Sequence, residues 1–306
     1  MHYFLQQFLN GLHSGALYAL LAFGYVLTNG MLKRTNLAHG PVFAFSGQVL
    51  ILVAVFGWQV LWLTLPATIA LGTAAAFFYA ALTAWILSRS VFLPLAAGSS
   101  PNAVVVATLG VSLVLMELGR IAADTRDFWL PPMLAEAVTF TVSADGFRVT
   151  LTVVQLIDCT VAGAVILLAG LLVARSRFGR NWRAVSDDRL AAAMCGIDTR
   201  RVFFTAVLSG AMLAALAGIM AALYYGNISF DTGLVFGLKV LFVTAVGGYR
   251  DPLRAAAGAA AFGIAESLWS GYSPLEWRDA WMFALLAAML VLRAQDGSPE
   301  QRKGLA

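Results

Sequence analysis

Residues 175–201 read RSRFGRNWRAVSDDRLAAAMCGIDTRR, and this strongly charged stretch decides the fold. It holds seven arginines and three aspartates, whereas residues 151–174 before it and 202–225 after it are apolar. A charged segment between two runs of membrane-spanning length lies outside the lipid. Because short connections rich in arginine stay in the cytoplasm, the sequence predicts a cytoplasmic loop between two membrane helices.

The middle of this loop is predicted to be a short helix over SDDRLAAAMCGI. Asp187 and Asp188 stand near its start, where acidic side chains suit the positive end of a helix. Gly196 is expected at its C-terminal end, where glycine commonly ends a helix. Charge alone leaves two interpretations, a helix that docks on a partner or a solvated loop that only sets the topology.

The composition extends the membrane prediction to the whole chain. Of its 306 residues, 60% are hydrophobic and 12% are charged, whereas soluble domains carry about 25% charged residues. The net charge of +4 does not indicate nucleic-acid binding, since the basic residues cluster at membrane edges. Cys159 and Cys195 are expected in different compartments, so no disulfide is predicted. The first apolar stretch lacks the features of a cleavable signal and is expected to be a true span.

The predicted fold is an all-α polytopic membrane protein with about 8–10 transmembrane helices. A single transmembrane domain is expected over residues 1–293, followed by a polar C-terminal tail over residues 294–306. The N-terminus is predicted outside. The apolar stretches are residues 4–32, 42–56, 60–87, 102–122, 151–174, 202–225, 234–246, 255–269 and 281–292.

The long connection over residues 123–150 is predicted to lie outside, because it has few basic residues for its length. Within it, VTFTVSADGFRVTLT alternates apolar and polar residues, and Asp145-Gly146 is a turn signal. A small extracytoplasmic β-hairpin is therefore expected.

Residues 36–41 interrupt the apolar pattern with Asn36, His39 and Pro41. They form either a discontinuous or re-entrant helix or a plain cytoplasmic turn with Pro41 at the first helical position. Residues 20–47 and 238–263 share one rhythm, a short apolar run, a basic turn and a second run rich in glycine and alanine. This suggests a two-fold internal repeat of the kind found in transporters, although Gly-rich membrane helices also resemble each other by composition alone.

Four ionisable residues fall inside apolar spans, where each costs roughly 3 kcal/mol and needs a partner or a water-filled cavity. They are Glu117, Asp158, Lys239 and Glu266. Glu117 is three residues from Arg120 and could pair with it on one helix face, and Lys239 could pair with Glu266. A structural role between helices and a substrate role both fit these residues.

No catalytic constellation is present. The three histidines have no metal-ligand spacing to cysteine or acidic clusters, so no metal site is predicted. Without a P-loop motif, ATP hydrolysis would have to come from a partner. An integral-membrane enzyme is therefore disfavoured.

Several passages resemble the LivH-type permease subunits of branched-chain amino acid ABC importers. The resemblance covers residues 5–293, and TNLAHG and the charged loop are its most specific parts. Related permeases carry sugars, and importers of urea or amides have similar permeases. The passages are NGLHSGALYALLAFGYVLTNG, TNLAHG, GRNWRAVSDDRLAAAMCGIDTRRV, and ALAGIMAALYYGNIS with GLKVLFVTAVGG and the ESLWSGY…EWRDAWMFALL end.

The resemblance implies that the charged loop holds the coupling helix that docks in a groove of an ATPase subunit. Trp182, Met194 and Cys195 depart from the family pattern. The residues expected to contact the ATPase are Gly179, Arg180, Ala184, Asp187, Asp188, Ala191, Gly196 and Ile197. Candidates for the translocation pathway are Asn36, His39, Lys239 and Glu266.

The resemblance also implies the partners and the location. A permease in the bacterial inner membrane would work with a second, LivM-like permease or a second copy of itself, with two ATPase subunits that hold ATP and Mg, and with a periplasmic substrate-binding protein. No cofactor would be bound by this chain. One rival hypothesis is an ion- or proton-coupled secondary transporter that works alone, supported by Glu117, Asp158 and Glu266. Another is an ABC permease for a different small solute such as urea or amides.

Overall fold

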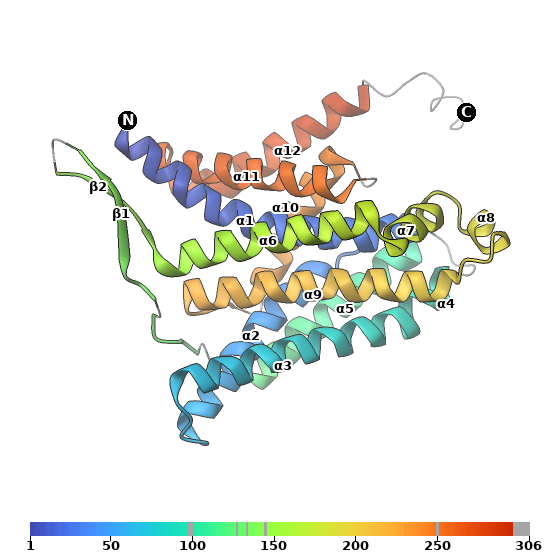
Figure 1. The fold of residues 1–306 in the computed structure, drawn as a ribbon, viewed down its shortest axis with the longest axis horizontal. Helices are drawn as coiled ribbons and strands as arrows, with labels where there is room; N and C mark the ends of the chain where they lie inside the picture. The colour runs from blue at the N-terminus through green and yellow to red at the C-terminus, as the bar shows by residue number, and fades with distance from the viewer. Residues whose placement is uncertain are drawn as a thin grey trace.

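The computed structural model describes residues 1–96, 101–126, 128–132, 134–143, 146–229, 231–248 and 251–295, and the structural statements below concern these residues. They form helices joined by short connections, with one two-stranded sheet (Figure 1). A π-helical segment, Leu87–Phe92, joins α3 to α4, and a 3₁₀ turn, Leu275–Trp277, precedes α12. The elements are α1 (His2–Leu32), α2 (His39–Gln59), α3 (Leu65–Ile86), α4 (Leu93–Ala96), α5 (Pro101–Ala122), β1 (Ala137–Val142), β2 (Arg148–Thr152), α6 (Val153–Arg175), α7 (Arg177–Asp187), α8 (Arg189–Met194), α9 (Thr199–Tyr225), α10 (Thr232–Gly247), α11 (Pro252–Tyr272) and α12 (Arg278–Gln295).

The prediction of an all-α polytopic membrane protein is confirmed. Among the described residues, six helices are long and apolar enough to cross a membrane, namely α1, α2, α3 with its continuation, α5, α6 and α9. Helices α10, α11 and α12 lie beside them in the bundle (Figure 1). The expected total of about 8–10 spans, which would include these three helices, stays a prediction.

Helices α1, α2 and α9 form the centre of the bundle, and α3, α5 and α6 form its periphery. In the apolar 18-residue stretch of each helix, 83% of the residues are buried in α1 and 22% are buried in α6. Small residues allow the central helices to approach closely, as at Gly24 and Gly210 between α1 and α9. The peripheral helices expose large apolar side chains, which suits a lipid or a second membrane subunit.

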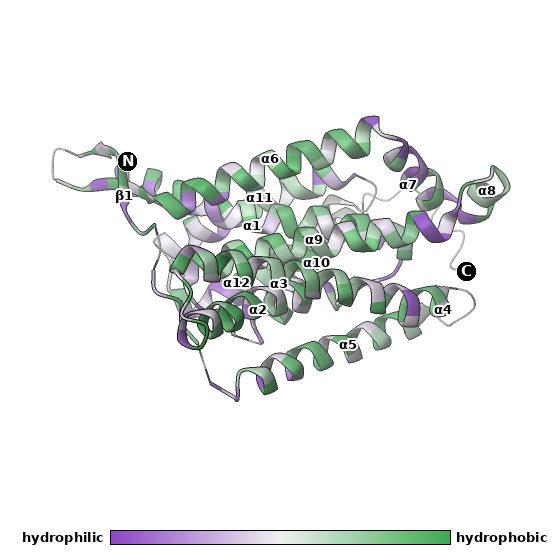
Figure 2. Cartoon of the chain, turned by 60° about the horizontal axis from the view of Figure 1, so that its bottom comes forward, coloured by the Kyte–Doolittle hydropathy of each residue, from purple (hydrophilic) through white to green (hydrophobic). Residues whose placement is uncertain are grey.

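The two ends of the bundle differ in character. Helices α7 and α8 stand at one end, whereas the hairpin and the start of α1 lie at the other (Figure 1). Hydrophobic residues run along the helices, and hydrophilic residues gather around α7 at one end and around β1 at the other (Figure 2). The charged loop and the long connection thus lie at opposite ends, and the membrane sides assigned to them stay predictions.

The predicted β-hairpin is confirmed: β1 and β2 pair antiparallel, with an irregularity between Thr139 and Thr141. On β2, Val149 and Leu151 are buried. The side chain of Gln6 on α1 exchanges two hydrogen bonds of 2.8 Å with the backbone of Thr150. This contact fixes the hairpin to the N-terminal part of α1. Asp145 of the expected turn lies outside the described residues.

Several element boundaries differ from the sequence prediction. The span placed over residues 60–87 begins at Leu65 and continues as π-helix and α-helix to Ala96, so part of the predicted loop after residue 87 is helical. The last helix extends to Gln295, two residues into the predicted tail. The remaining tail, residues 296–306, lies outside the described residues. Helix ends are the least certain part of sequence patterns, because the apolar signal fades gradually there.

The two segments of the suggested repeat occupy related places. Each is a helix, a turn and a second helix, α1 with α2 and α10 with α11. Helix α1 packs along α11, and α2 packs against α10. The segments therefore lie together at the centre of the fold, where a repeat would be expected to build a shared site.

Candidate functional site

A cluster of ionised side chains joins four helices near the centre of the protein. Lys239 Nζ on α10 donates to Glu266 Oε1 on α11 at 2.6 Å and lies 2.9 Å from Asp279 Oδ1 on α12. The hydroxyl of Tyr18 on α1 donates to the second carboxylate oxygen, Glu266 Oε2, at 2.7 Å. Arg278 Nε lies 3.6 Å from Glu266 Oε1. Two cations and two carboxylates therefore balance one another.

The pairing of Lys239 with Glu266, left open by the sequence, is present in the structure. Both residues are buried, and an isolated buried charge is disfavoured by several kcal/mol, so each needs the other. Sequence reasoning missed Arg278 and Asp279, because they fall between the apolar stretches predicted over residues 255–269 and 281–292. They occupy the first turn of α12. The available signal was the charged pair directly before an apolar run, which is typical of a helix start.

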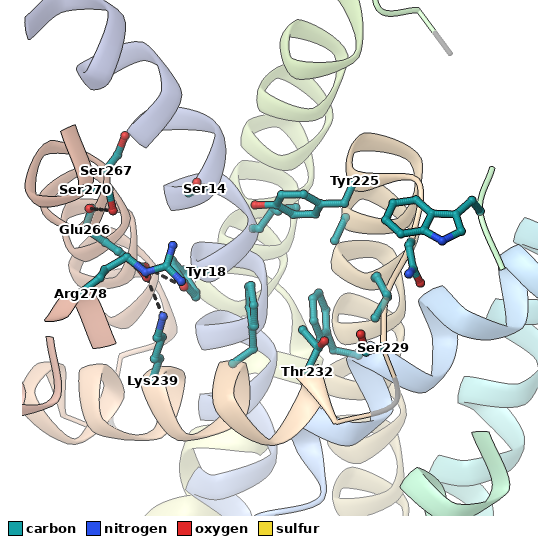
Figure 3. Close-up of a pocket in the computed structure, with 17 residues that line it drawn as sticks. Ser14, Tyr18, Tyr225, Ser229, Thr232, Lys239, Glu266, Ser267, Ser270 and Arg278 are labelled. Atoms are coloured by element: carbon teal, nitrogen blue, oxygen red, sulfur yellow. Dashed lines mark hydrogen bonds and ion pairs between the residues drawn. The ribbon is translucent and has the colours of Figure 1, made fainter. Parts of the chain in front are cut away.

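The cluster faces a cavity of about 550 Å³ (Figure 3). Lys239, Glu266, Arg278 and Tyr18 point toward one another on one side of it, and Tyr225 lies across the cavity. Tyr225 ends α9, whose other end carries α8, so the cavity lies in the half of the bundle nearer the hairpin. The structure thus places two of the predicted pathway candidates, Lys239 and Glu266, on the wall of one cavity.

The rest of the wall combines apolar and aromatic side chains with hydroxyl and amide groups. The rings of Phe43 on α2 and Phe236 on α10 stack with their centroids 5.2 Å apart, and the ring of Tyr18 lies 5.4 Å from Phe236. Leu17 and Ile228 add aliphatic surface. Apolar surface combined with convergent polar groups is typical of small-molecule sites.

Asn36 and His39, the other two pathway candidates, do not line this cavity. Both are buried. The side chain of Asn36 accepts a hydrogen bond of 3.1 Å from the amide of Ala38. His39 donates through Nε2 to the carbonyl of Leu21 at 3.1 Å, and its ring packs against Tyr25. The pathway role of all four candidates stays a prediction.

The contact between His39 and Leu21 shows how the chain returns into the bundle. Leu21 lies eleven residues before the end of α1 at Leu32, which is about 16 Å along a helix. Helix α2 therefore starts inside the bundle and not at its end. This favours the discontinuous alternative for residues 36–41. Pro41 occupies the third helical position, not the first, where its missing N–H is still harmless.

His39→Ala is expected to reduce uptake and to lower the melting temperature of the solubilised protein, while co-purification of an ATPase partner is kept. The hydrogen bond to Leu21 contributes about 1 kcal/mol, and loss of the ring adds a packing defect at the start of α2. His39→Phe, which keeps the ring volume, should recover most of the melting temperature. Wild-type uptake in His39→Ala at equal expression would show that this contact is dispensable.

The remaining intramembrane acids are also paired. Asp158 Oδ2 on α6 lies 2.9 Å from His13 Nε2 on α1, and both side chains are buried. Glu117 and Arg120 form the predicted pair on one face of α5, where both are exposed. Each acid that supported the rival hypothesis of a secondary transporter therefore has a basic partner.

The charged loop forms two helices where the sequence predicted one. Asp188 follows the last residue of α7 and caps α8, because its Oδ1 accepts hydrogen bonds from the amides of Leu190 at 2.8 Å and Ala191 at 3.0 Å. These bonds lower the pKa of the Asp188 carboxyl below its ordinary value. Asp187 is the last residue of α7, so the expectation that both aspartates start a helix is wrong for Asp187. Gly196 has the expected left-handed conformation, with φ of 82°.

The break at Asp188 also separates residues that were expected to contact the ATPase. Ala184 is half-buried on α7, whereas Ala191 is exposed on α8, so the two do not share one continuous helix face. Leu190 and Met194 on α8 are exposed as well, although both are apolar. Of the other residues assigned to ATPase contact, Arg180 is exposed, Gly179 is buried, and Ile197 is half-buried.

Helix α7 is fastened to the membrane bundle. Trp182, which departs from the family pattern, is buried and donates from Nε1 to the carbonyl of Leu27 on α1 at 3.0 Å. Lys33 at the end of α1 donates from Nζ to the carbonyl of Asp187 at 2.8 Å. Arg183 donates to the carbonyl of Val173 on α6 at 2.8 Å. Movement of α7 would therefore act directly on α1, which also carries Tyr18.

Comparison with known proteins gives one consistent result. Residues 7–291 match the family described as branched-chain amino acid transport system / permease component. The chain is 30% identical to the high-affinity branched-chain amino acid transport system permease protein LivH of Salmonella typhimurium, over 98% of each chain. It is 27% identical to BraD of Pseudomonas aeruginosa, a permease protein of the same kind of system, over 99% of each chain. The autoinducer 2 import system permease protein LsrC of Salmonella paratyphi B is 29% identical, over 60% of this chain and 46% of LsrC.

Proposed function

Because the chain belongs to the family of branched-chain amino acid transport permease components, we propose that it imports branched-chain or related small amino acids as the permease subunit of an ATP-driven transporter. The observation that carries the proposal is the position of two features in one bundle. A charged pair of helices, α7 and α8, stands at one end, and the cavity lies in the other half. Helix α1 contacts both, through Leu27 and Tyr18.

The proposed partners follow from the missing P-loop motif and from the exposed apolar surfaces of the outer helices. Its sequence has no P-loop, so ATP and Mg would be held by two ATPase subunits that dock on α7 and α8. A substrate-binding protein would deliver the amino acid at the hairpin end. The apolar outer surfaces of α3, α5 and α6 suit lipid and a second permease, either LivM-like or another copy of this chain.

The experiment is uptake of labelled leucine into proteoliposomes that contain the chain, a candidate ATPase, a second permease and the binding protein. Uptake should require ATP and should continue in the presence of a proton uncoupler. Replacement of the P-loop lysine of the ATPase should abolish uptake. Uptake that depends on a proton gradient and ignores ATP would overturn the proposal in favour of a secondary transporter.

Ala191→Trp is expected to abolish co-purification of the ATPase and substrate-stimulated ATP hydrolysis, with the membrane bundle intact. Ala191 is exposed on α8 outside the apolar spans, so a large side chain there blocks docking without affecting the core. The matched control is Ala135→Trp, an exposed position at the opposite end, which should bind the ATPase normally.

Two variants of Asp188 distinguish the effect of its charge from the effect of its helix cap in the same assay. Asp188→Asn keeps a capping side chain and removes the charge, whereas Asp188→Arg removes the cap and reverses the charge. If a basic residue in the ATPase groove pairs with Asp188, removal of the Asp188 charge weakens the complex by about 2–5 kcal/mol. Asp188→Asn alone should then reduce co-purification of the ATPase. Full co-purification and full stimulation in Ala191→Trp and in both Asp188 variants would make α8 a topological element only.

A further inference from the structure

We propose that the ion cluster on the cavity wall is a recognition site for the charged backbone of a zwitterionic α-amino acid, with Arg278 as the carboxylate-binding group and Glu266 as the ammonium-binding group. The aromatic and aliphatic part of the wall, formed by Phe43, Phe236, Leu17 and Ile228, would take the side chain. This inference rests on the proposed function and assigns a substrate site to the permease itself, separate from any site on a binding protein.

The exposure and the hydrogen bonding of Arg278 support its assignment as the group that binds the substrate carboxylate. Its side chain is 39% exposed, and its Nε makes only long contacts, 3.4 Å to Asp279 Oδ1 and 3.6 Å to Glu266 Oε1. Within the described part of the chain, its terminal Nη atoms have no hydrogen-bond partner. A guanidinium has five N–H donors, and its outer fork suits two-point binding of a carboxylate. Arg278 lines the cavity, so these donors are available to a solute there (Figure 3).

Glu266 is the only carboxylate among the described residues that line this cavity. Its oxygens already accept from Lys239 and Tyr18, which fix the carboxylate in place. A carboxylate has about four acceptor sites, so Glu266 can accept one further donor. An ammonium group can approach it from the cavity, next to Ser270, whose hydroxyl donates to the Glu266 carbonyl.

The charge balance selects for a zwitterion. Lys239 and Arg278 are balanced by Glu266 and Asp279, so the unoccupied cluster is neutral. A zwitterion leaves it neutral, whereas an amine or a carboxylic acid alone would add an uncompensated charge to a partly buried site, which is disfavoured. Amides, ureas and sugars are uncharged. They would leave the guanidinium N–H donors of Arg278 without a carboxylate partner.

The apolar wall supplies the second half of the selection. Phe43, Phe236, Leu17 and Ile228 face the same cavity as the cluster. Burial of a branched aliphatic side chain against them contributes about 0.8 kcal/mol per methylene group. The site therefore combines one charged and one apolar subsite, as an aliphatic amino acid requires.

The test is protection of a cysteine placed in the cavity. Ser270→Cys, in a background with Cys159→Ser and Cys195→Ser, puts a thiol one helical turn from Glu266. The assembled transporter in nanodiscs is treated with a small thiol reagent, alone or with leucine, 4-methylpentanoate or 3-methylbutylamine. The last two keep the aliphatic chain of leucine and lack the ammonium or the carboxylate group. Leucine should slow the reaction severalfold, and the two analogues should not.

Arg278→Gln should remove the protection by leucine, and Arg278→Lys should restore part of it. Arg278 is partly exposed, so both variants should fold, which the melting temperature checks. A cysteine at Ala135, outside the cavity, should react at one rate with and without leucine. Equal protection by either analogue, or protection that survives in Arg278→Gln, would overturn the inference.

The same preparation separates this inference from the proposed function. ATP-dependent uptake of leucine without any protection at position 270 would overturn the site and leave the chain a permease. Absence of ATP-dependent uptake for every amino acid tried would overturn the proposed function itself.

Discussion

Lys239→Met is expected to destabilise the folded protein by about 3–5 kcal/mol, because it leaves the buried carboxylate of Glu266 without its closest cation. The Nζ of Lys239 lies 2.6 Å from Glu266 Oε1, while Arg278 is 3.6 Å away and more exposed. Transport should be lost as well, since the cluster lines the cavity. The measurements are the melting temperature in detergent and ATP-dependent uptake.

The double variant Lys239→Met with Glu266→Gln is the decisive control. It removes both buried charges, and the amide oxygen of glutamine can still accept from Tyr18. Most of the lost melting temperature should return, while transport stays absent. Arg254→Met removes a cation whose side chain is 82% exposed beside Asp251, and it should change stability by less than about 1 kcal/mol. A wild-type melting temperature in Lys239→Met alone would show that the pair is not needed for the fold.

Gly40→Ala is expected to disrupt the contact between α2 and α10 and to reduce both yield and uptake. A methyl group at Gly40 would lie 2.5 Å from the Cα of Gly237 and would collide with the carbonyl of Gly233. All these atoms belong to backbone, so no side chain can move aside. Overpacking of this kind costs about 1–3 kcal/mol. The displaced helices carry Phe43 and Phe236, so the cavity wall should shift as well.

Gly258→Ala is the matched control for this substitution. Gly258 lies on α11, and a methyl group there would meet nothing within 4 Å. The variant should be unchanged or stabilised by up to about 1 kcal/mol, because alanine favours helix over glycine. The readout is the share of protein in the monodisperse peak, together with uptake. Equal behaviour of the two variants would contradict the close packing at Gly40.

The sequence alone could identify features that depend on neighbours along the chain. Long apolar runs, a charged loop between two of them and an alternating stretch with a turn signal predict membrane helices, a connection outside the lipid and a hairpin. It could also mark Lys239 and Glu266 as residues that need partners, because a charge in an apolar span must be compensated. The left-handed position of Gly196 followed from the same kind of local rule.

Only the tertiary structure decides which of these residues meet. Tyr18 and Glu266 are 248 positions apart and share a hydrogen bond, and Arg278 joins them from the connection between two predicted spans. Asn36 and His39 have the polar character of a pathway, yet Asn36 bonds to the amide of Ala38 and His39 packs against α1. The cavity is lined instead by Phe43, one turn further along α2.

The physical reason is the rotation of each helix about its axis. Apolar spans have weak amphipathic patterns, so their sequence does not show which face turns inward. That choice is made where backbones touch, at Gly40 against Gly233 and Gly237 and at Gly24 against Gly210. Local sequence therefore determined the helices and the charged loop, whereas close packing between distant segments decided which side chains line the cavity.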